Sequence, residues 1–218
     1  MEKILVCGAG GHGKVVIDAI EREEKRKILG VIDDNANLHG KDYYGYEVIG
    51  GFDRLDGNAY KDCRFILAIA RNNIRRILQR RLESLDYEFV SIIHPSALIA
   101  KGVSIGPGSM IMANTVINPS AKIGTSVVVN TGAIIEHDCV IDDFTHIGPG
   151  VHLAGAVSVG AGSFVGIGAS VIEFIKIGSS SIIGAGAVVV DDVPDNVTAV
   201  GVPARILKRT NSHEYSHS

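Results

Sequence analysis

The chain has 218 residues, of which 46% are hydrophobic, so it can bury one large core or two small ones. Its net charge of −3, with acidic and basic residues interspersed, argues against a nucleic-acid-binding surface. No apolar run approaches a membrane span, the N-terminus does not resemble a signal peptide, and three widely spaced cysteines disfavour disulfides or a zinc knuckle. We therefore expect a protein of the reducing cytoplasm that binds neither nucleic acid nor membrane.

Residues 1–92 alternate short apolar strands with helical periodicity, which predicts a parallel α/β sheet. Strands are expected at 3–7, 28–32, 64–69 and 88–92. One helix should end near residue 24, and a second should run from an N-cap at Asn72 or Asn73 to about residue 85. Since ligands of such sheets bind at the carboxyl ends of the strands, we expect a Rossmann-like nucleotide-binding domain.

A glycine-rich turn follows the first strand, with Gly8, Gly10 and Gly13 in the pattern G-x-G-x-x-G and Asp33 after the second strand. Glycines at a helix N-terminus let backbone N–H groups approach phosphate, and the later carboxylate can take ribose hydroxyls. A purely structural glycine turn fits the same pattern. NAD is disfavoured as a cofactor, because no dehydrogenase substrate domain follows.

Residues 95–190 divide into sixteen hexads without an insertion, from PSALIA to AGAVVV. The fifth residue of every hexad is aliphatic, and the third is small or β-branched. A fixed short period over this length is typical of a β-helical solenoid, in which each coil buries its side chains against its neighbours. Because open ends and faces are normally covered, we expect the front domain and the C-terminal segment to cap the stack and a homotrimer to cover its sides.

Three solenoid histidines, His137, His146 and His152, fall within one stretch shorter than a coil. His137 is flanked by Glu136 and Asp138, and a carboxylate beside an imidazole fixes its tautomer and raises its basicity, as a general base requires. An exposed histidine in an acidic turn is the plainer interpretation. Cysteine 139, at an inward third position, is a poor nucleophile candidate.

The chain resembles the NeuD/PglD family of sugar O- and N-acyltransferases in GAGGHGKV, IDD, IIHPSA, NTGAIIEHDC and the closing GVPAR, over essentially its whole length. The resemblance implies a left-handed parallel β-helix of hexapeptide repeats behind a Rossmann-like domain. It implies a nucleotide-sugar-binding domain at 1–92, an acetyltransferase domain with a C-terminal cap at 93–210, and a polar tail at 211–218. It further implies acetyl-CoA as co-substrate, with no metal.

The resemblance also assigns site residues. His137 would be the general base, oriented by Asp138. The nucleotide-activated sugar would be held by Gly10, Gly11, His12, Gly13, Asp33, Asp34, Arg75 and Asn130, with Gly10–Gly13 at the diphosphate. Acetyl-CoA would be held by His146, Gly155, Ile167, Ala185 and Lys208, and the backbone N–H of Gly155 would face the thioester oxygen. Ala70-Arg71-Asn72 departs from the usual third loop of the family, so the nucleotide and the sugar stay open.

The preferred function is N-acetylation of a nucleotide-linked 4-amino sugar. Three alternatives remain: O-acetylation of a sugar such as sialic acid, a zinc enzyme resembling γ-carbonic anhydrases with the three histidines as ligands, and a non-catalytic sugar-nucleotide sensor. His137 and His146 lie half an eighteen-residue coil apart. We therefore expect them on different parts of the prism, sharing one site only across a subunit boundary.

Overall fold

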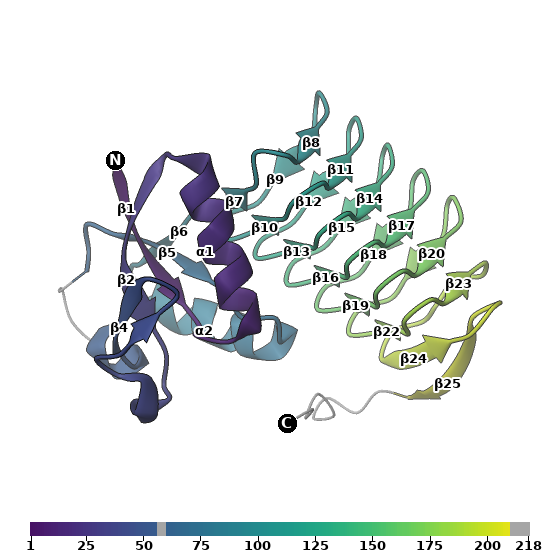
Figure 1. Ribbon diagram of the computed structural model, residues 1–218. Helices are drawn as coiled ribbons and strands as arrows, with labels where there is room; N and C mark the ends of the chain where they lie inside the picture. The colour runs from purple at the N-terminus through teal and green to yellow at the C-terminus, as the bar shows by residue number, and fades with distance from the viewer. Residues whose placement is uncertain (56–59, 210–218) are drawn as a thin grey trace.

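The computed structural model describes residues 1–55 and 60–209, which form an α/β domain followed by a three-faced parallel β-helix (Figure 1). The polar tail expected at 211–218, with His213 and His217, lies outside the described residues. No described helix is long and apolar enough to span a bilayer.

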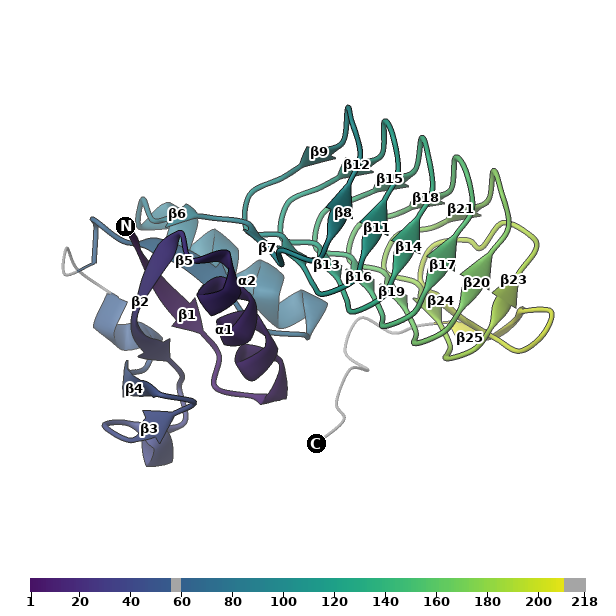
Figure 2. The same ribbon diagram turned by 45° about the horizontal axis from the view of Figure 1, so that its top comes forward.

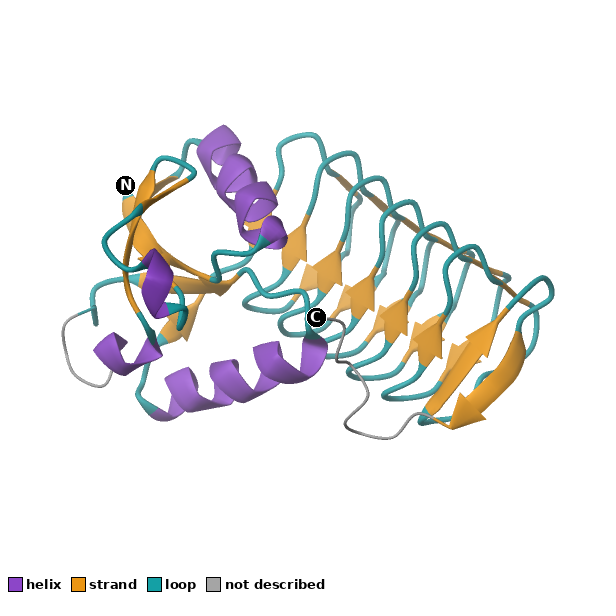
Figure 3. Ribbon diagram, turned by 60° about the horizontal axis from the view of Figure 1, so that its bottom comes forward, coloured by secondary structure: helices purple, strands orange, loops and turns teal. Residues whose placement is uncertain are grey.

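The α/β domain has a six-stranded sheet in the order β3-β4-β2-β1-β5-β6, parallel except for the β3–β4 hairpin. Its strands are β1 Glu2–Cys7, β2 Arg26–Ile32, β3 Asp42–Tyr43, β4 Tyr46–Gly50, β5 Arg64–Leu67 and β6 Glu88–Phe89. Helices α1 Gly11–Glu23 and α2 Asn72–Ser84 pack on opposite faces of this sheet (Figure 3), and η1 Ala36–Leu38 and η2 Phe52–Leu55 are short 3-10 turns. The expected parallel sheet is present, and the β3–β4 hairpin is an addition to it.

Two local expectations need correction. Helix α2 begins at Asn72 with Arg71 at the N-cap and no side-chain cap, because the amide of Asn72 instead donates to the carbonyls of Gly162 and Ser163 on the β-helix. The single strand expected at 88–92 is two strands, β6 and β7 Ile92–Ile93. The second of these already pairs with the β-helix, so the coils begin ahead of Pro95.

Three parallel sheets form the faces of the β-helix. Face I contains β7, β10 Met110–Ile111, β13 Val128–Val129, β16 His146–Ile147, β19 Phe164–Val165, β22 Ile182–Ile183 and β24 Val197–Val200, with β25 Arg205–Arg209 antiparallel at its end. Face II contains β8 Leu98–Ile99, β11 Val116–Ile117, β14 Ile134–Ile135, β17 His152–Leu153, β20 Ser170–Val171 and β23 Val188–Val189. Face III contains β9 Ser104–Ile105, β12 Lys122–Ile123, β15 Val140–Ile141, β18 Ser158–Val159 and β21 Lys176–Ile177.

The hexad pattern explains this geometry. Each strand is the fourth and fifth residue of a hexad, and residues one coil apart are paired, as with Ile135 and Leu153. The fifth positions point inward and join the small third positions in one continuous core. Since the first residue of each strand points outward, only those positions and the corners between faces can carry chemistry.

The α/β domain covers the N-terminal part of face I, as Figures 1 and 2 show. The outward residues Ile92, Met110 and Val128 are fully buried in one cluster with Val16 and Ile20 of α1. The two domains therefore share a core at their interface, the seam, where α1 and α2 meet face I.

Candidate active site

The glycine-rich turn meets the amino end of α1 at the carboxyl edge of the sheet. Gly13 must lack a side chain, because a Cβ there would lie 2.3 Å from the carbonyl oxygen of Gly8. Gly10 and Gly11 have open space where a Cβ would point, and Gly10 caps α1 without a side-chain bond. Of the glycines expected at the diphosphate, Gly10 and Gly11 are thus accessible, whereas Gly13 serves close packing.

The two aspartates after β2 hold the neighbouring loops. One oxygen of Asp33 accepts the N–H of Ala9 at 2.7 Å, and the other accepts the N–H of Asn35 at 2.9 Å. Asp34 Oδ1 accepts the N–H of Phe52 at 2.9 Å. These contacts fix the shape of the carboxyl edge, and each carboxylate oxygen keeps a second lone pair for a ligand hydroxyl.

His137 and Asp138 lie at the corner between faces II and III, between β14 and β15. The Nδ1 of His137 is 2.8 Å from Asp138 Oδ2, and both side chains are about 60% exposed. The His137 ring lies against Gly155 on the next coil, where a Cβ would come within 2.7 Å of its Cε1 and Nε2. This leaves an oriented imidazole beside the backbone of the next coil, as the eighteen-residue period predicts.

His146 lies on face I, under the α/β domain, and is only 6% exposed. Its Nδ1 is 3.3 Å from the carbonyl oxygen of Ala70, and its Nε2 is 3.3 Å from the amide nitrogen of Asn130. The neutral tautomer with a proton on Nδ1 satisfies both contacts. Burial, and then the charge of Arg75, lowers the pKa of His146 to about 3.

His12 lies in the seam between the domains. Its ring centroid is 6.3 Å from that of His146. Among the residues that the structure describes, its Nε2 is the one buried side-chain nitrogen or oxygen without a hydrogen-bond partner. Burial, and then the charge of Arg75, lowers the pKa of His12 to about 4. A neutral imidazole facing His146 differs from the diphosphate contact expected for this residue.

The structure gives Arg75 a different role from the expected contact with the nucleotide sugar. Its side chain is fully buried, and its guanidinium donates to the carbonyls of Ile69 at 2.8 Å, Ser126 at 2.9 Å and Phe144 at 3.1 Å. Burial lowers its pKa to about 9, which leaves it charged at neutral pH. Arg75 therefore holds α2 to the β-helix, and its donors are not directed at a substrate.

The remaining residues expected at acetyl-CoA line a different edge. Ile167 and Ala185 are exposed on successive coils of the corner between faces I and II, where the N–H of Gly186 donates to the Ile167 carbonyl at 2.8 Å. Asn130 begins the same corner two coils earlier. Lys208 is exposed on β25 and pairs with Thr198.

Within one subunit the expected site residues thus form separate groups. His137, Asp138 and Gly155 lie at the corner between faces II and III, whereas His146 lies on face I and His152 on face II. The described residues include no group of three His, Cys, Asp or Glu side chains placed to hold a metal ion, so the structure does not bring the three histidines together as ligands. Cys139 is buried with a raised pKa of about 11, as expected for an inward thiol.

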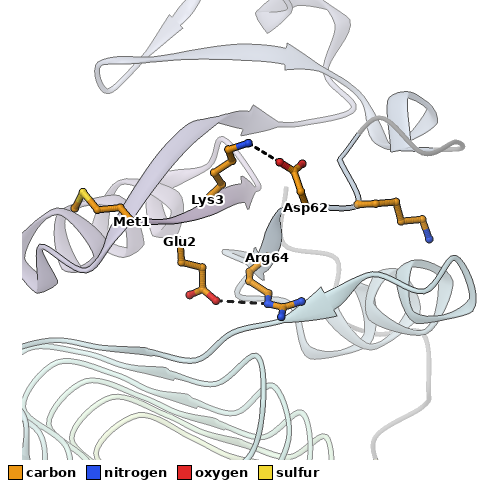
Figure 4. Close-up of a pocket in the computed structure, with 6 residues that line it drawn as sticks. Met1, Glu2, Lys3, Asp62 and Arg64 are labelled. Atoms are coloured by element: carbon orange, nitrogen blue, oxygen red, sulfur yellow. Dashed lines mark hydrogen bonds and ion pairs between the residues drawn. The ribbon is translucent and has the colours of Figure 1, made fainter.

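A shallow pocket lies at the opposite edge of the sheet, at the amino ends of β1 and β5 (Figure 4). Its charged groups have partners: Lys3 contacts Asp62, Arg64 lies 3.5 Å from Glu2, and Lys61 donates to the carbonyl of Leu85. Because these charges are already compensated and the pocket is remote from the glycine-rich turn, it is no part of the candidate site.

Sequence reasoning missed one residue of the nucleotide edge. The hydroxyl of Tyr43, on β3, donates to the carbonyl of Gly10 at 2.5 Å and also lies where a Cβ on Gly13 would point. This contact ties the β3–β4 hairpin to the glycine-rich turn. No sequence signal marked it, because it depends on how the hairpin folds back.

Comparison with known proteins adds to this geometry. The model of the PglD N-terminal domain matches residues 3–82. The chain is 41% identical over 117 residues to UDP-N-acetylbacillosamine N-acetyltransferase of Bacillus subtilis (strain 168), a match covering 52% of this chain and 52% of that enzyme. It is 30% identical over 215 residues to GDP-perosamine N-acetyltransferase of Escherichia coli O157:H7, covering 94% of this chain and 96% of that enzyme.

Among solved structures, PerB from Caulobacter crescentus in complex with CoA and GDP-perosamine is similar with a TM-score of 0.86 and 37% sequence identity. The match covers 94% of this chain and 97% of PerB. These similarities confirm the expected fold, an N-terminal α/β domain followed by a left-handed parallel β-helix.

Proposed function

This chain belongs to the NeuD/PglD family of sugar O- and N-acyltransferases, and from that premise we propose that it transfers an acetyl group from acetyl-CoA to the amine of a nucleotide-linked 4-amino sugar. The observation that carries the proposal is the exposed His137–Asp138 pair lying against Gly155. The similar enzymes from B. subtilis and E. coli are named as N-acetyltransferases of nucleotide-linked amino sugars, which favours an amine over a sugar hydroxyl.

The corner between faces II and III supplies the chemistry in this proposal. His137 takes the proton of the attacking amine through Nε2, while Asp138 holds the ring through Nδ1. The backbone N–H of Gly155 has no acceptor within residues 1–55 and 60–209, so it is free to donate to the developing oxyanion. Thiolate departure from the thioester then completes the transfer without a covalent enzyme intermediate.

The carboxyl edge of the sheet supplies substrate affinity. The open backbone at Gly10 and Gly11, at the amino end of α1, suits a diphosphate, since N–H groups and the helix dipole favour an anion there. Asp33 and Asp34 follow β2 directly at the same edge, where their free lone pairs suit ribose and base. In this arrangement the nucleotide binds the α/β domain and the sugar binds the β-helix.

The active assembly in this proposal is a homotrimer. His137 and His146 lie on different parts of one coil, so a site that uses both needs two subunits. Face II also presents outward apolar residues, with Leu98 61% exposed, whereas face III presents Lys122 and Lys176. A cyclic arrangement would cover face II and form three equivalent clefts.

The test is a thiol-release assay with acetyl-CoA against UDP- and GDP-linked 4-amino sugars, with matched 4-hydroxy sugars and free sialic acid as controls. We expect CoA release with at least one amine and acetylation of its nitrogen by mass spectrometry. Turnover of hydroxyl sugars alone would establish O-acetylation instead. Nucleotide-sugar binding without CoA release from any acceptor would indicate the sensor.

A further inference from the structure

The position of Gly155 is unusual among the corners between faces II and III. The corresponding residues on other coils are Lys101, Pro119 and Glu173, and each carries a Cβ. Gly155 does not adopt a positive φ, so its backbone does not require glycine. The corner therefore tolerates a side chain in general, and some local contact excludes one here.

That contact is the ring of His137. A Cβ on Gly155 would lie 2.7 Å from both Cε1 and Nε2 and 3.4 Å from Nδ1, and the three nearest atoms all belong to this imidazole. The two coils are joined by the N–H of Ala156, which donates to the His137 carbonyl at 2.9 Å. The coil spacing is thus set by the backbone, and the ring occupies the volume that a side chain at position 155 would fill.

The His137 side chain contacts Asp138 through a hydrogen bond and lies against the backbone of Gly155. Its side chain is 60% exposed, and the single hydrogen bond to Asp138 at 2.8 Å fixes one nitrogen without fixing the plane of the ring. An exposed side chain held at one point keeps rotamer freedom that reduces the fraction in a productive geometry. The flat surface of a glycine on the next coil removes much of that freedom.

We propose that Gly155 is a positioning residue: the absence of its side chain seats the His137 imidazole so that Nε2 lies beside the backbone of the next coil. This role is separate from the donor role of the Gly155 N–H, which any residue except proline could fill. The test of this role by kcat rests on the proposed acetyl transfer. It also places base and oxyanion donor on adjacent coils of one subunit.

The test compares Gly155→Ala with wild type and with His137→Ala. Alanine keeps the N–H, so CoA binding by calorimetry and the KM for the nucleotide sugar should stay within about twofold of wild type. The value of kcat should fall by about 10–100-fold, because a ring displaced by even 1 Å loses its alignment. Unchanged kcat would overturn the proposal.

A double variant separates positioning from general damage to the corner. In the His137→Ala background no ring meets the new methyl group, so Gly155→Ala should lower neither the residual rate nor the melting temperature further. A further loss of rate as large as that in wild type would show that the methyl group acts on the backbone or on CoA. It would refute the proposal that Gly155 positions the His137 ring. If wild type itself releases no CoA with any acceptor, the proposed function fails. The melting temperatures of the four proteins would then still show whether ring and methyl group compete.

Discussion

His137 hydrogen-bonds to Asp138 through one nitrogen and keeps the other exposed, which is the arrangement that a general base needs. Replacing His137 with Ala should therefore reduce kcat by about 10²–10⁴-fold. Asp138→Asn should cost less, since an amide oxygen can still accept the Nδ1 proton. Steady-state kinetics at saturating acetyl-CoA measures both effects.

His152→Ala is the matched control, because His152 is an exposed histidine on the neighbouring face II. It should retain the wild-type kcat. A His137→Ala protein with more than about a tenth of the wild-type rate would remove His137 from the base role.

Single residues were predictable where their partners are close in the chain or lie a whole coil away. The adjacency of His137 and Asp138 gave the pair, and the eighteen-residue period placed Gly155 beside His137. His12 was not predictable in the same way. Its ring faces His146, 134 positions further along (146 − 12), and only the packing of the domains decides that contact.

At the scale of elements, a buried arginine joins Asn72 and Gln79 in tying helix α2 to the β-helix. The guanidinium of Arg75 bonds the carbonyls of Ser126 and Phe144 on two coils and that of Ile69 in its own domain. We expect Arg75→Met to lower the free energy of unfolding by about 3 kcal/mol, because it leaves buried carbonyls without donors. Urea denaturation followed by circular dichroism measures the loss.

Arg80→Met serves as the control, since Arg80 lies on the exposed side of the same helix. It should change stability by less than about 0.5 kcal/mol. Equal losses of stability from the two substitutions would contradict the interpretation that Arg75 holds α2 to the β-helix.

The hexad pattern predicted the strands of the β-helix because inward positions recur at fixed spacing, and core packing enforces that spacing in every coil. The seam with the α/β domain was not predictable. Asn72 was expected to cap α2, yet its amide reaches Gly162 and Ser163 instead. Local propensity favours Asn as an N-cap, but it does not encode carbonyls that only the packing of the two domains brings within reach of the Asn72 amide.

At the scale of the whole molecule, the seam should make stability depend on pH. His146 on β16 is buried and His12 on α1 is half-buried with a buried Nε2, and the two rings lie near each other and near the charged Arg75 of α2. Their folded pKa values of about 4 and 3 lie below the ordinary 6.5, so the folded state favours the neutral form. The stability is therefore complete above about pH 6.5 and falls as the pH drops toward 4, by up to about 3 kcal/mol for each histidine.

Urea unfolding between about pH 7 and pH 4 tests this dependence. His146→Asn should unfold with a shallower dependence on pH than wild type, because one of the two histidines with a lowered pKa no longer binds a proton on unfolding. The exposed His152→Asn should keep the wild-type dependence. Identical profiles for all three proteins would show that other groups dominate acid unfolding.

The proposed trimer can be tested through the positions of two histidines on one coil. His137 projects from the corner between faces II and III, and His146 lies on face I of the same coil. If each cleft of a trimer takes His137 from one subunit and His146 from the next, inactive His137→Ala and His146→Ala proteins can complement each other. In randomly mixed equal amounts, about a quarter of the clefts would carry both histidines, so about a quarter of the wild-type rate should return. Subunit exchange is monitored with two affinity tags on the same proteins. Demonstrated exchange with no recovered activity would show that each site lies within a single subunit.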